Sequence, residues 1–358
     1  MPVSTFAYIL LRVAAQVGLE PTHSSPSSSS RGFSISWIPM SPSSEPKAKE
    51  NRSRNLTRTN SLSMMAFHVL FAVVVALLAS AHHIITRESE TMPGAEVCVS
   101  HDSPNPLAQQ HPNLISGTLN GTTLIVPIPL SRARELIPSN YSISEAAYRS
   151  LLPSFPAGMY PMVAQIVHDH DIQFPAYNAS LPDFSRASFE FPFIDVLGTG
   201  HSSFRYVAAM LISASNPLAI EGSRTYGMSA DAASFDPPCD AYAARGGSAT
   251  THAHAASYPS GDAYMTLETE ASNDGGAQYP LAFIADVVNQ PVFGGDAQKC
   301  DYYRRVFDAG LAPPVPVRGS VRAAALQPFQ GVESWEAGVG GWRLATGFLE
   351  PPQTEVCR

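Results

Sequence analysis

Asn216 to Asp231 read NPLAIEGSRTYGMSAD, and this stretch directly follows an apolar run, AAMLISA, from Ala208 to Ala214. A short continuous apolar run bounded by turn residues is typical of a strand buried on both faces. The stretch after it brings together Glu221, Arg224 and Tyr226, side chains that carry charge or a hydroxyl group. The sequence therefore predicts a buried strand that leads into a polar segment.

Further strand patterns lie on both sides of this segment. Six segments rich in β-branched and aromatic residues, several of them alternating apolar and polar, predict strands: Tyr160–Phe174, Ala187–Leu197, Ser203–Ser215, Asp262–Ala271, Val321–Phe329 and Gly341–Glu350. Leu114–Pro129 predicts a hairpin, because Asn120-Gly121 between two β-rich arms is a tight-turn signal. Short helices are predicted from Ser131 to just before Pro138 and over Asp301–Ala309. The sum is a mainly β (α+β) protein, an antiparallel barrel with a few short helices over residues 114–351 and a tail at 352–358.

The order of these motifs resembles the acetoacetate decarboxylase family. It starts with Gly117-Thr-Leu-Asn-Gly121, followed by a helix ending at Ile137-Pro138, then a strand with Ile166-Val-His168-Asp169. The buried strand Phe204–Ser215 then runs into Asn216–Asp231, which resembles the family's active-site segment. The resemblance implies an acetoacetate decarboxylase-like β-barrel with a cavity for a small molecule.

The chemistry of that family needs a Schiff-base lysine, whose pKa must be lowered so that a neutral amine can attack a ketone. The two lysine positions fall on Ser229 and Ala230, and neither side chain can form an imine. Lys299 is the only lysine after residue 81, in the polar stretch GGDAQKCD. We therefore do not expect decarboxylation through an imine, although the resemblance itself implies a carboxy-lyase.

The segment that matches the family's active site supplies the first candidate site. Glu221 could act as an acid or base and Arg224 could hold a carboxylate in a bidentate pair. Tyr226, Met228, Ser229 and Arg205 complete the expected ligand-binding residues. The alternative interpretation is a structural Glu–Arg pair at the barrel rim.

Two His-x-His pairs supply the second candidate. Residues i and i+2 of a strand point to one face, so His168 with His170, and His252 with His254, could each offer two imidazoles to a metal. The alternative is ordinary polar histidines. No cofactor is expected apart from this metal.

A secretory leader is indicated by MMAFHVLFAVVVALLASA, residues 64–81, an apolar run followed by Ala-Ser-Ala. The protein is thus expected to be secreted; the alternative is a signal-anchored membrane protein. Residues 1–63 are rich in Ser, Pro and basic residues and are expected to be disordered, either as a gene-model extension upstream of a start at Met64 or Met65, or as an organelle-targeting peptide. Residues 82–113 are expected to be an extended lead-in.

Four cysteines lie after the leader, which in an extracellular protein indicates two disulfides. Of the three pairings that four cysteines allow, we expect Cys98–Cys357 and Cys239–Cys300. Sequons at Asn120, Asn140 and Asn178 predict glycosylated surface positions.

The composition limits the partners. The formal net charge is −8, with 22 Lys and Arg against 30 Asp and Glu, and no basic stripe indicates nucleic-acid binding. No stable membrane span is expected, since the apolar run is shorter than about 20 residues. The leading prediction is a lysine-less acetoacetate decarboxylase-like protein that binds a small organic acid or performs non-imine lyase or isomerase chemistry. The alternatives are a metal-dependent enzyme on the histidine pairs and a non-catalytic extracellular structural or interaction protein.

Overall fold

The computed structural model describes residues 98–99, 104–272, 276–295 and 298–358. The predicted segments 1–63 and 64–81, and most of the lead-in, lie outside the described residues.

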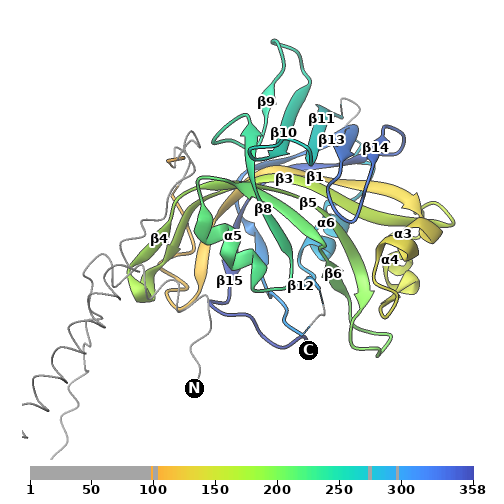
Figure 1. Cartoon of the computed structure of the whole chain (residues 1–358), viewed down its shortest axis with the longest axis horizontal. Coiled ribbons are helices and arrows are strands. Elements are labelled where there is room, and N and C mark those ends of the chain that lie inside the picture. Colours follow the sequence, from red (N-terminus) through yellow and green to blue (C-terminus); the bar gives the residue numbers. More distant parts are fainter. Residues whose placement is uncertain (1–97, 100–103, 273–275, 296–297) are drawn as a thin grey trace, which may run out of the picture. The chain divides into compact units, whose positions relative to one another are not determined.

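Within the described residues, nine strands close into a barrel (Figure 1). Around the barrel they are β1 (Ile115–Pro129), β3 (Met159–Phe174), β5 (Phe184–Asp195), β7 (Ala209–Ser213), β8 (Ser229–Asp236), β10 (Thr251–Ser257), β11 (Tyr264–Ala271), β13 (Arg304–Ala324) and β15 (Gly340–Glu350), which pairs again with β1. Neighbours run antiparallel except β7 and β8, which are parallel. The predicted fold class, a mainly β barrel with short helices, is confirmed.

Shorter elements decorate the barrel. The strands are β2 (Ser142–Ile143), β4 (Ala179–Leu181), β6 (Phe204–Tyr206), β9 (Ala243–Ala244), β12 (Val292–Phe293) and β14 (Val332–Trp335). The helices are α3 (Leu130–Leu136), α4 (Glu145–Leu151), α5 (Pro217–Arg224), α6 (Leu281–Val288) and the 3-10 turn η1 (Pro175–Tyr177). The helix predicted from Ser131 is confirmed as α3, which lies beside α4 at one end of the long strands β1 and β3 (Figure 1).

Helix α5 makes the crossover that the parallel pair β7 and β8 requires. Asn216 caps its start, because its side chain accepts a hydrogen bond from the Ala219 backbone N–H at 3.0 Å. Pro217 occupies the first turn, where a missing N–H costs nothing. The quoted segment Asn216–Asp231 thus comprises this cap, the helix and the start of β8.

The hairpin predicted at Asn120-Gly121 is wrong. Both residues lie inside the continuous strand β1, where Asn120 pairs with His168 and Gly121 with Val167. A Cβ at Gly121 would stand 2.6 Å from the Ile166 carbonyl oxygen and 2.6 Å from the Val167 side chain. A glycine is needed at this position because the backbones of β1 and β3 approach closely there. A glycine within a strand pattern can therefore mark a close strand contact and need not mark a turn.

The helix predicted over Asp301–Ala309 is also wrong, because β13 begins at Arg304 and pairs with β15. Its side chains alternate, with Tyr303 and Arg305 buried and Arg304 exposed between them. Arg305 points inward, where its guanidinium donates to the Thr346 and Thr123 hydroxyls. Pairing with β15 and these inward polar bonds override the helical tendency of a short charged segment.

The disulfides join Cys98 to Cys239 and Cys300 to Cys357, so the predicted pairing is wrong. The reason is backbone pairing between segments that lie far apart in the sequence. Cys300 exchanges both backbone hydrogen bonds with Glu355, and this bridge brings the tail, including Cys357, against residue 300. Cys98 in turn forms a bridge with Asp183.

Two small apolar clusters lie beside the main core. One contains Ile115, Leu119, Val167, Ile172, Phe174, Leu181, Tyr303 and Phe348. The other contains Val207, Met210, Ile212, Ala219, Ile220, Tyr226, Met228, Ala230 and Val292. Members of both clusters line one cavity.

Candidate functional site

The cavity has a volume of about 90 Å³ and its walls are largely apolar. The apolar lining comes from both small clusters and from Phe184, which packs against both: Ile115, Ile172, Leu181, Phe184, Met210, Ala219, Met228, Val292 and Phe348. Strands β3, β5, β7 and β15, helix α5 and the segment before β13 all contribute to the lining. A mostly apolar cavity with a few converging polar groups is the usual form of a small-molecule site.

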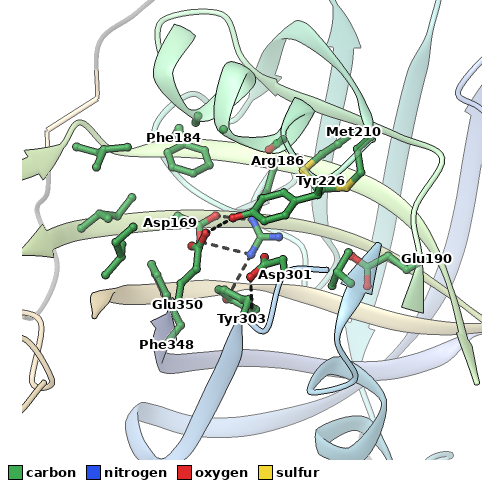
Figure 2. A pocket seen from close by; sticks show the side chains of 18 of the residues that line it. Asp169, Phe184, Arg186, Glu190, Met210, Tyr226, Asp301, Tyr303, Phe348 and Glu350 are labelled. Carbon is green, nitrogen blue, oxygen red and sulfur yellow. Dashed lines mark hydrogen bonds and ion pairs between the residues drawn. The ribbon is translucent and has the colours of Figure 1, made fainter. Parts of the chain in front are cut away.

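The polar groups of the cavity converge from elements far apart in the sequence. Figure 2 shows the polar ends of Asp169, Arg186, Tyr226, Tyr303 and Glu350 directed toward one another, with Asp301 beside them. Arg186 on β5 donates from Nε to Asp169 Oδ2 at 2.7 Å and from Nη2 to the Tyr303 hydroxyl at 3.3 Å. Burial opposes the charge on Arg186, but Asp169 and its other neighbours raise its pKa overall. Arg186 therefore stays a cation.

Glu350 at the end of β15 accepts a hydrogen bond from the Tyr226 hydroxyl at 2.7 Å. Burial, and then the negative charge of Asp301, raise the pKa of Glu350 to about 8. Burial likewise raises the pKa of Tyr226 well above its usual value. At neutral pH the pair is thus a protonated Glu350 carboxyl group beside the Tyr226 phenol. The carboxyl group can donate a proton, and the phenol hydroxyl can stabilise the negative charge that remains on the carboxylate.

Asp301 is the second carboxyl group with a raised pKa. Burial raises the pKa to about 6, against a hydrogen bond from the Tyr303 backbone N–H and the charges of Arg186 and Arg205. Neither Asp301 nor Glu350 forms an ion pair with a basic side chain among the described residues.

Glu190, which belongs to a second ion pair, lies to one side of this group (Figure 2). Arg205 Nη1 on β6 stands 2.8 Å from Glu190 Oε2, and both side chains are at most 3% exposed. Glu190 Oε1 accepts from Ser188 Oγ at 3.1 Å and from Gln165 Nε2. Arg205 Nε, although buried, has no hydrogen-bond partner.

Of the residues predicted from the sequence, Tyr226, Met228 and Arg205 line the cavity. Ser229 is exposed at the start of β8, and the matching Ala230 is buried in an apolar cluster. Glu221 and Arg224 lie outside the cavity lining, each about half exposed, with a 3.6 Å contact between them. Arg224 also donates to the Ala230 carbonyl. Glu221 and Arg224 thus form an exposed pair outside the cavity wall.

The histidine pairs are held separately. His168 and His170 are buried with their rings 6.0 Å apart, and they contact the hydroxyls of Ser185 and Thr118 respectively. His252 contacts Asp236 and His254 contacts Thr266. In the part of the chain that is described, no three His, Cys, Asp or Glu side chains form a group that could hold a metal ion. The predicted four-histidine or three-histidine site is therefore not assembled.

Two of the predicted glycosylation positions, Asn140 and Asn178, are exposed. Asn120 is different, because it lies within β1, half-buried, with its amide toward Asp240. Lys299, the single lysine after residue 81, is exposed and does not line the cavity.

Sequence reasoning missed Asp169, Arg186, Asp301, Tyr303 and Glu350 as site residues. For Asp169 a signal existed, since it is a carboxylate within the VHDHD motif, on the strand face opposite to that of His168 and His170. No such signal existed for Arg186, Asp301 and Glu350. They lie at or near strand ends, where charged residues are common and do not by themselves indicate a functional site.

The described chain forms a closed β-barrel with an acid-rich cavity. Its fold is similar to that of acetoacetate decarboxylase-like enzymes. MppR, an enduracididine biosynthesis enzyme solved in complex with pyruvate, aligns at 10% identity over 68% of this chain and 89% of its own, with a TM-score of 0.41. An acetoacetate decarboxylase from Legionella pneumophila aligns at 11% identity over 77% and 95%, with a TM-score of 0.39. An acetoacetate decarboxylase-like enzyme from Sphingomonas wittichii RW1 aligns at 10% identity over 68% and 92%, also with a TM-score of 0.39. These similarities concern the fold alone.

No family model and no curated protein matches the sequence. In the described part of the chain, none of the helices has the length and apolar character needed to cross a bilayer.

Proposed function

We propose that the protein binds a small molecule in this cavity and catalyses a non-imine proton transfer on it, as a lyase or isomerase would. The observation that carries the proposal is the Tyr226–Glu350 pair, a carboxyl group whose pKa burial raises to about 8, on the wall of an apolar cavity. Buried acids with raised pKa values are typical of groups that exchange protons with a substrate near neutral pH.

The step follows from the geometry. The Glu350 O–H bond breaks, its proton goes to a basic atom of the bound molecule, and Glu350 becomes a carboxylate. The Tyr226 hydroxyl, already donating to Oε1, stabilises the new negative charge. The reverse transfer, from the bound molecule to the carboxylate, restores the starting state. A non-imine route is supported by the cavity lining, which contains no lysine, and by Lys299, the only lysine among the described residues, which is exposed.

A panel of small carbonyl and amine compounds incubated with the protein in D2O tests the proposal. NMR would detect exchange of carbon-bound hydrogen for deuterium, or a new product. We expect Glu350→Gln to reduce the rate by at least about 100-fold, the lower range for loss of a general acid or base. Glu221→Gln is the matched control, because Glu221 lies on the exposed face of α5 and should leave the rate unchanged. Equal rates for Glu350→Gln and the unmodified protein would contradict the assignment.

Tyr226→Phe gives an independent check. The Tyr226 hydrogen bond lowers the pKa of Glu350, so its removal should raise that pKa further. If protonated Glu350 is the required acid, activity falls as pH rises through about 8 in the unmodified protein. The variant should keep its activity to a higher pH. A pH–rate profile that does not move would exclude this role for Tyr226.

Secretion remains a proposal. It is supported by the leader-like residues 64–81, by two disulfides and by exposed sequons at Asn140 and Asn178. Expression of the full chain in a eukaryotic host, with mass analysis of the medium, tests it: recovery only from the cell interior would argue against secretion.

A further inference from the structure

The charged side chains of the cavity do not balance. Four carboxyl groups line it, those of Asp169, Glu190, Asp301 and Glu350, against the two guanidinium groups of Arg186 and Arg205. Both guanidiniums are already engaged, since Arg186 pairs with Asp169 at 2.7 Å and Arg205 with Glu190 at 2.8 Å. The two carboxyl groups left over are those of Asp301 and Glu350.

The hydrogen-bond partners of these two carboxyl groups are uncharged, and the arginines near them already form ion pairs with other carboxylates. Glu350 faces the Tyr226 hydroxyl and Asp301 faces the backbone N–H of Tyr303. The charged groups near enough to act on Glu350 are Asp301, Arg186 and Asp169, and those near enough to act on Asp301 are Arg186 and Arg205. Those arginines already neutralise Asp169 and Glu190. If Asp301 and Glu350 were both ionised, their two negative charges would have no basic side chain among the described residues to balance them. Burial of the two carboxyl groups raises both pKa values, and for Glu350 the negative charge of Asp301 adds to the effect, so both groups hold protons more strongly than in water.

An anionic ligand would make this imbalance worse. A carboxylate entering the cavity would have to displace Asp169 or Glu190 from its arginine, leaving a buried charge unpaired. A cation would instead supply the missing charge. The aromatic rings of Phe184, Tyr303 and Phe348 on the same walls also suit a cation, which is attracted to ring faces.

A second observation indicates that the cavity is incomplete without an occupant. Arg205 lines it, is 3% exposed, and keeps its Nε–H without a hydrogen-bond partner. Buried donors are rarely left unpaired, so this group suits an acceptor atom on a bound molecule.

Building on the proposed function, we infer that the cavity selects a small protonated amine with an apolar substituent, its ammonium group directed at Asp301 and Glu350, in preference to a carboxylic acid. With the ammonium bound, Glu350 is a carboxylate and takes part in the proposed transfer as the proton acceptor. The organic acid expected from the sequence would be held by Arg224, with Arg205 as a second cation. Arg224 lies outside the cavity lining, and Arg205 is already paired with Glu190. The apolar lining accommodates the substituent, and a neutral oxygen on the ligand would fit Arg205 Nε.

Three probes of nearly equal size and shape test the inference: isobutylamine, isobutyramide and isobutyrate. Their dissociation constants for the full chain would be measured by ligand-observed NMR titration in phosphate buffer at pH 6 and pH 8. We expect isobutylamine to bind at least tenfold more tightly than isobutyrate at pH 8. The affinity for isobutylamine should rise from pH 6 to pH 8. Over this range the carboxyl groups lose their protons and attract the ammonium group more strongly, while the amine itself stays charged.

Two variants locate the binding. Glu350→Gln is shaped like the protonated side chain, and Asp301→Asn keeps an oxygen for the Tyr303 N–H, so both should fold. Each should weaken isobutylamine binding at least tenfold and reduce its pH dependence. Glu221→Gln, which removes an exposed charge, should change neither and so controls for attraction to the acidic surface.

The outcomes separate the two proposals. If isobutyrate or isobutyramide binds as tightly as isobutylamine and Glu350→Gln alters that binding, the cation preference is wrong while the proposed site stands. If no probe binds, both proposals are overturned. If isobutylamine binds but neither cavity variant weakens it, the ammonium is not held by Asp301 and Glu350, and the inference is wrong.

Discussion

Arg205 and Glu190 show how much the cavity depends on single side chains. Both are almost completely buried, and they lie on neighbouring strands, β6 and β5. A buried ion pair contributes little net stability compared with apolar residues, yet removal of one partner leaves a charge that cannot be hydrated. Replacement of either residue alone should therefore destabilise the fold, because the remaining partner keeps a buried, unpaired charge.

We expect Arg205→Met to lower the free energy of unfolding by about 3–5 kcal/mol, because Glu190 is left buried and unpaired. The double variant Arg205→Met, Glu190→Gln should recover much of that loss, since neither charge remains. Urea unfolding of the two single variants and the double variant measures this coupling. Additive losses in the double variant would show that the pair does not act as a unit.

At this scale the sequence identified part of the site. Arg205, Tyr226 and Met228 could be predicted, because they lie on or next to a segment that resembles a known active site. Glu350 could not, since its role depends on burial and on the nearby charge of Asp301, which only the closed barrel brings together. Asp301 was further hidden by an expected helix that the chain does not form.

At the scale of the element, β1 depends on the absence of a side chain at its middle. Gly121 lets β3 approach so closely that any Cβ there would meet the Ile166 and Val167 backbone and side chain. The same strand positions Ile115 in the cavity at its beginning. A distortion at Gly121 would therefore be transmitted along the strand toward the site.

Gly121→Ala is expected to destabilise the protein by about 1–3 kcal/mol, the usual cost of forcing an extra carbon into a packed interior. Gly331→Ala is the matched control, because an added Cβ there meets nothing within 4 Å. Denaturant midpoints of both variants compare the two positions. Similar midpoints would mean that β1 and β3 separate without cost.

The sequence predicted most strands and α3, because alternation and proline boundaries are local signals. The predictions from the sequence were wrong where the same short pattern is compatible with two different local structures. Asn120-Gly121 suits a turn, but its glycine serves a close strand contact, and the charged Arg304-Arg305 run suits a helix, but β15 pairs with it. The disulfide pairing was not local either, since it follows from the Cys300–Glu355 bridge.

At the scale of the whole molecule, the raised pKa values couple stability to pH. The folded pKa of Glu350 is about 8 against an ordinary 4.5, and that of Asp301 about 6 against 3.8. The folded protein therefore binds more protons than the unfolded chain between those limits. Their stabilising contribution is complete below the ordinary values and is lost as pH rises through the folded ones.

We expect the free energy of unfolding to fall as pH rises from about 5 to about 8, at up to about 1.4 kcal/mol per pH unit for each extra bound proton. Glu350→Gln cannot titrate and should flatten this slope, most clearly between pH 6 and 8. Urea unfolding across this range gives the slopes. If the slopes of the two proteins coincide, Glu350 does not hold the extra proton.

The two disulfides have a consequence for how the protein could be divided. Each closes a loop on its own side of Lys299, one joining Cys98 to Cys239 and the other Cys300 to Cys357. A lysine-specific protease would cut the described chain once, at this exposed residue, and no covalent bond among the described residues would then join the halves. The C-terminal half would carry Asp301 and Glu350, and the N-terminal half Asp169 and Arg186, with β13 and β15 as strands to be re-inserted between β11 and β1. The barrel thus offers a natural split-protein pair, in which fragment reassociation alone would rebuild the cavity.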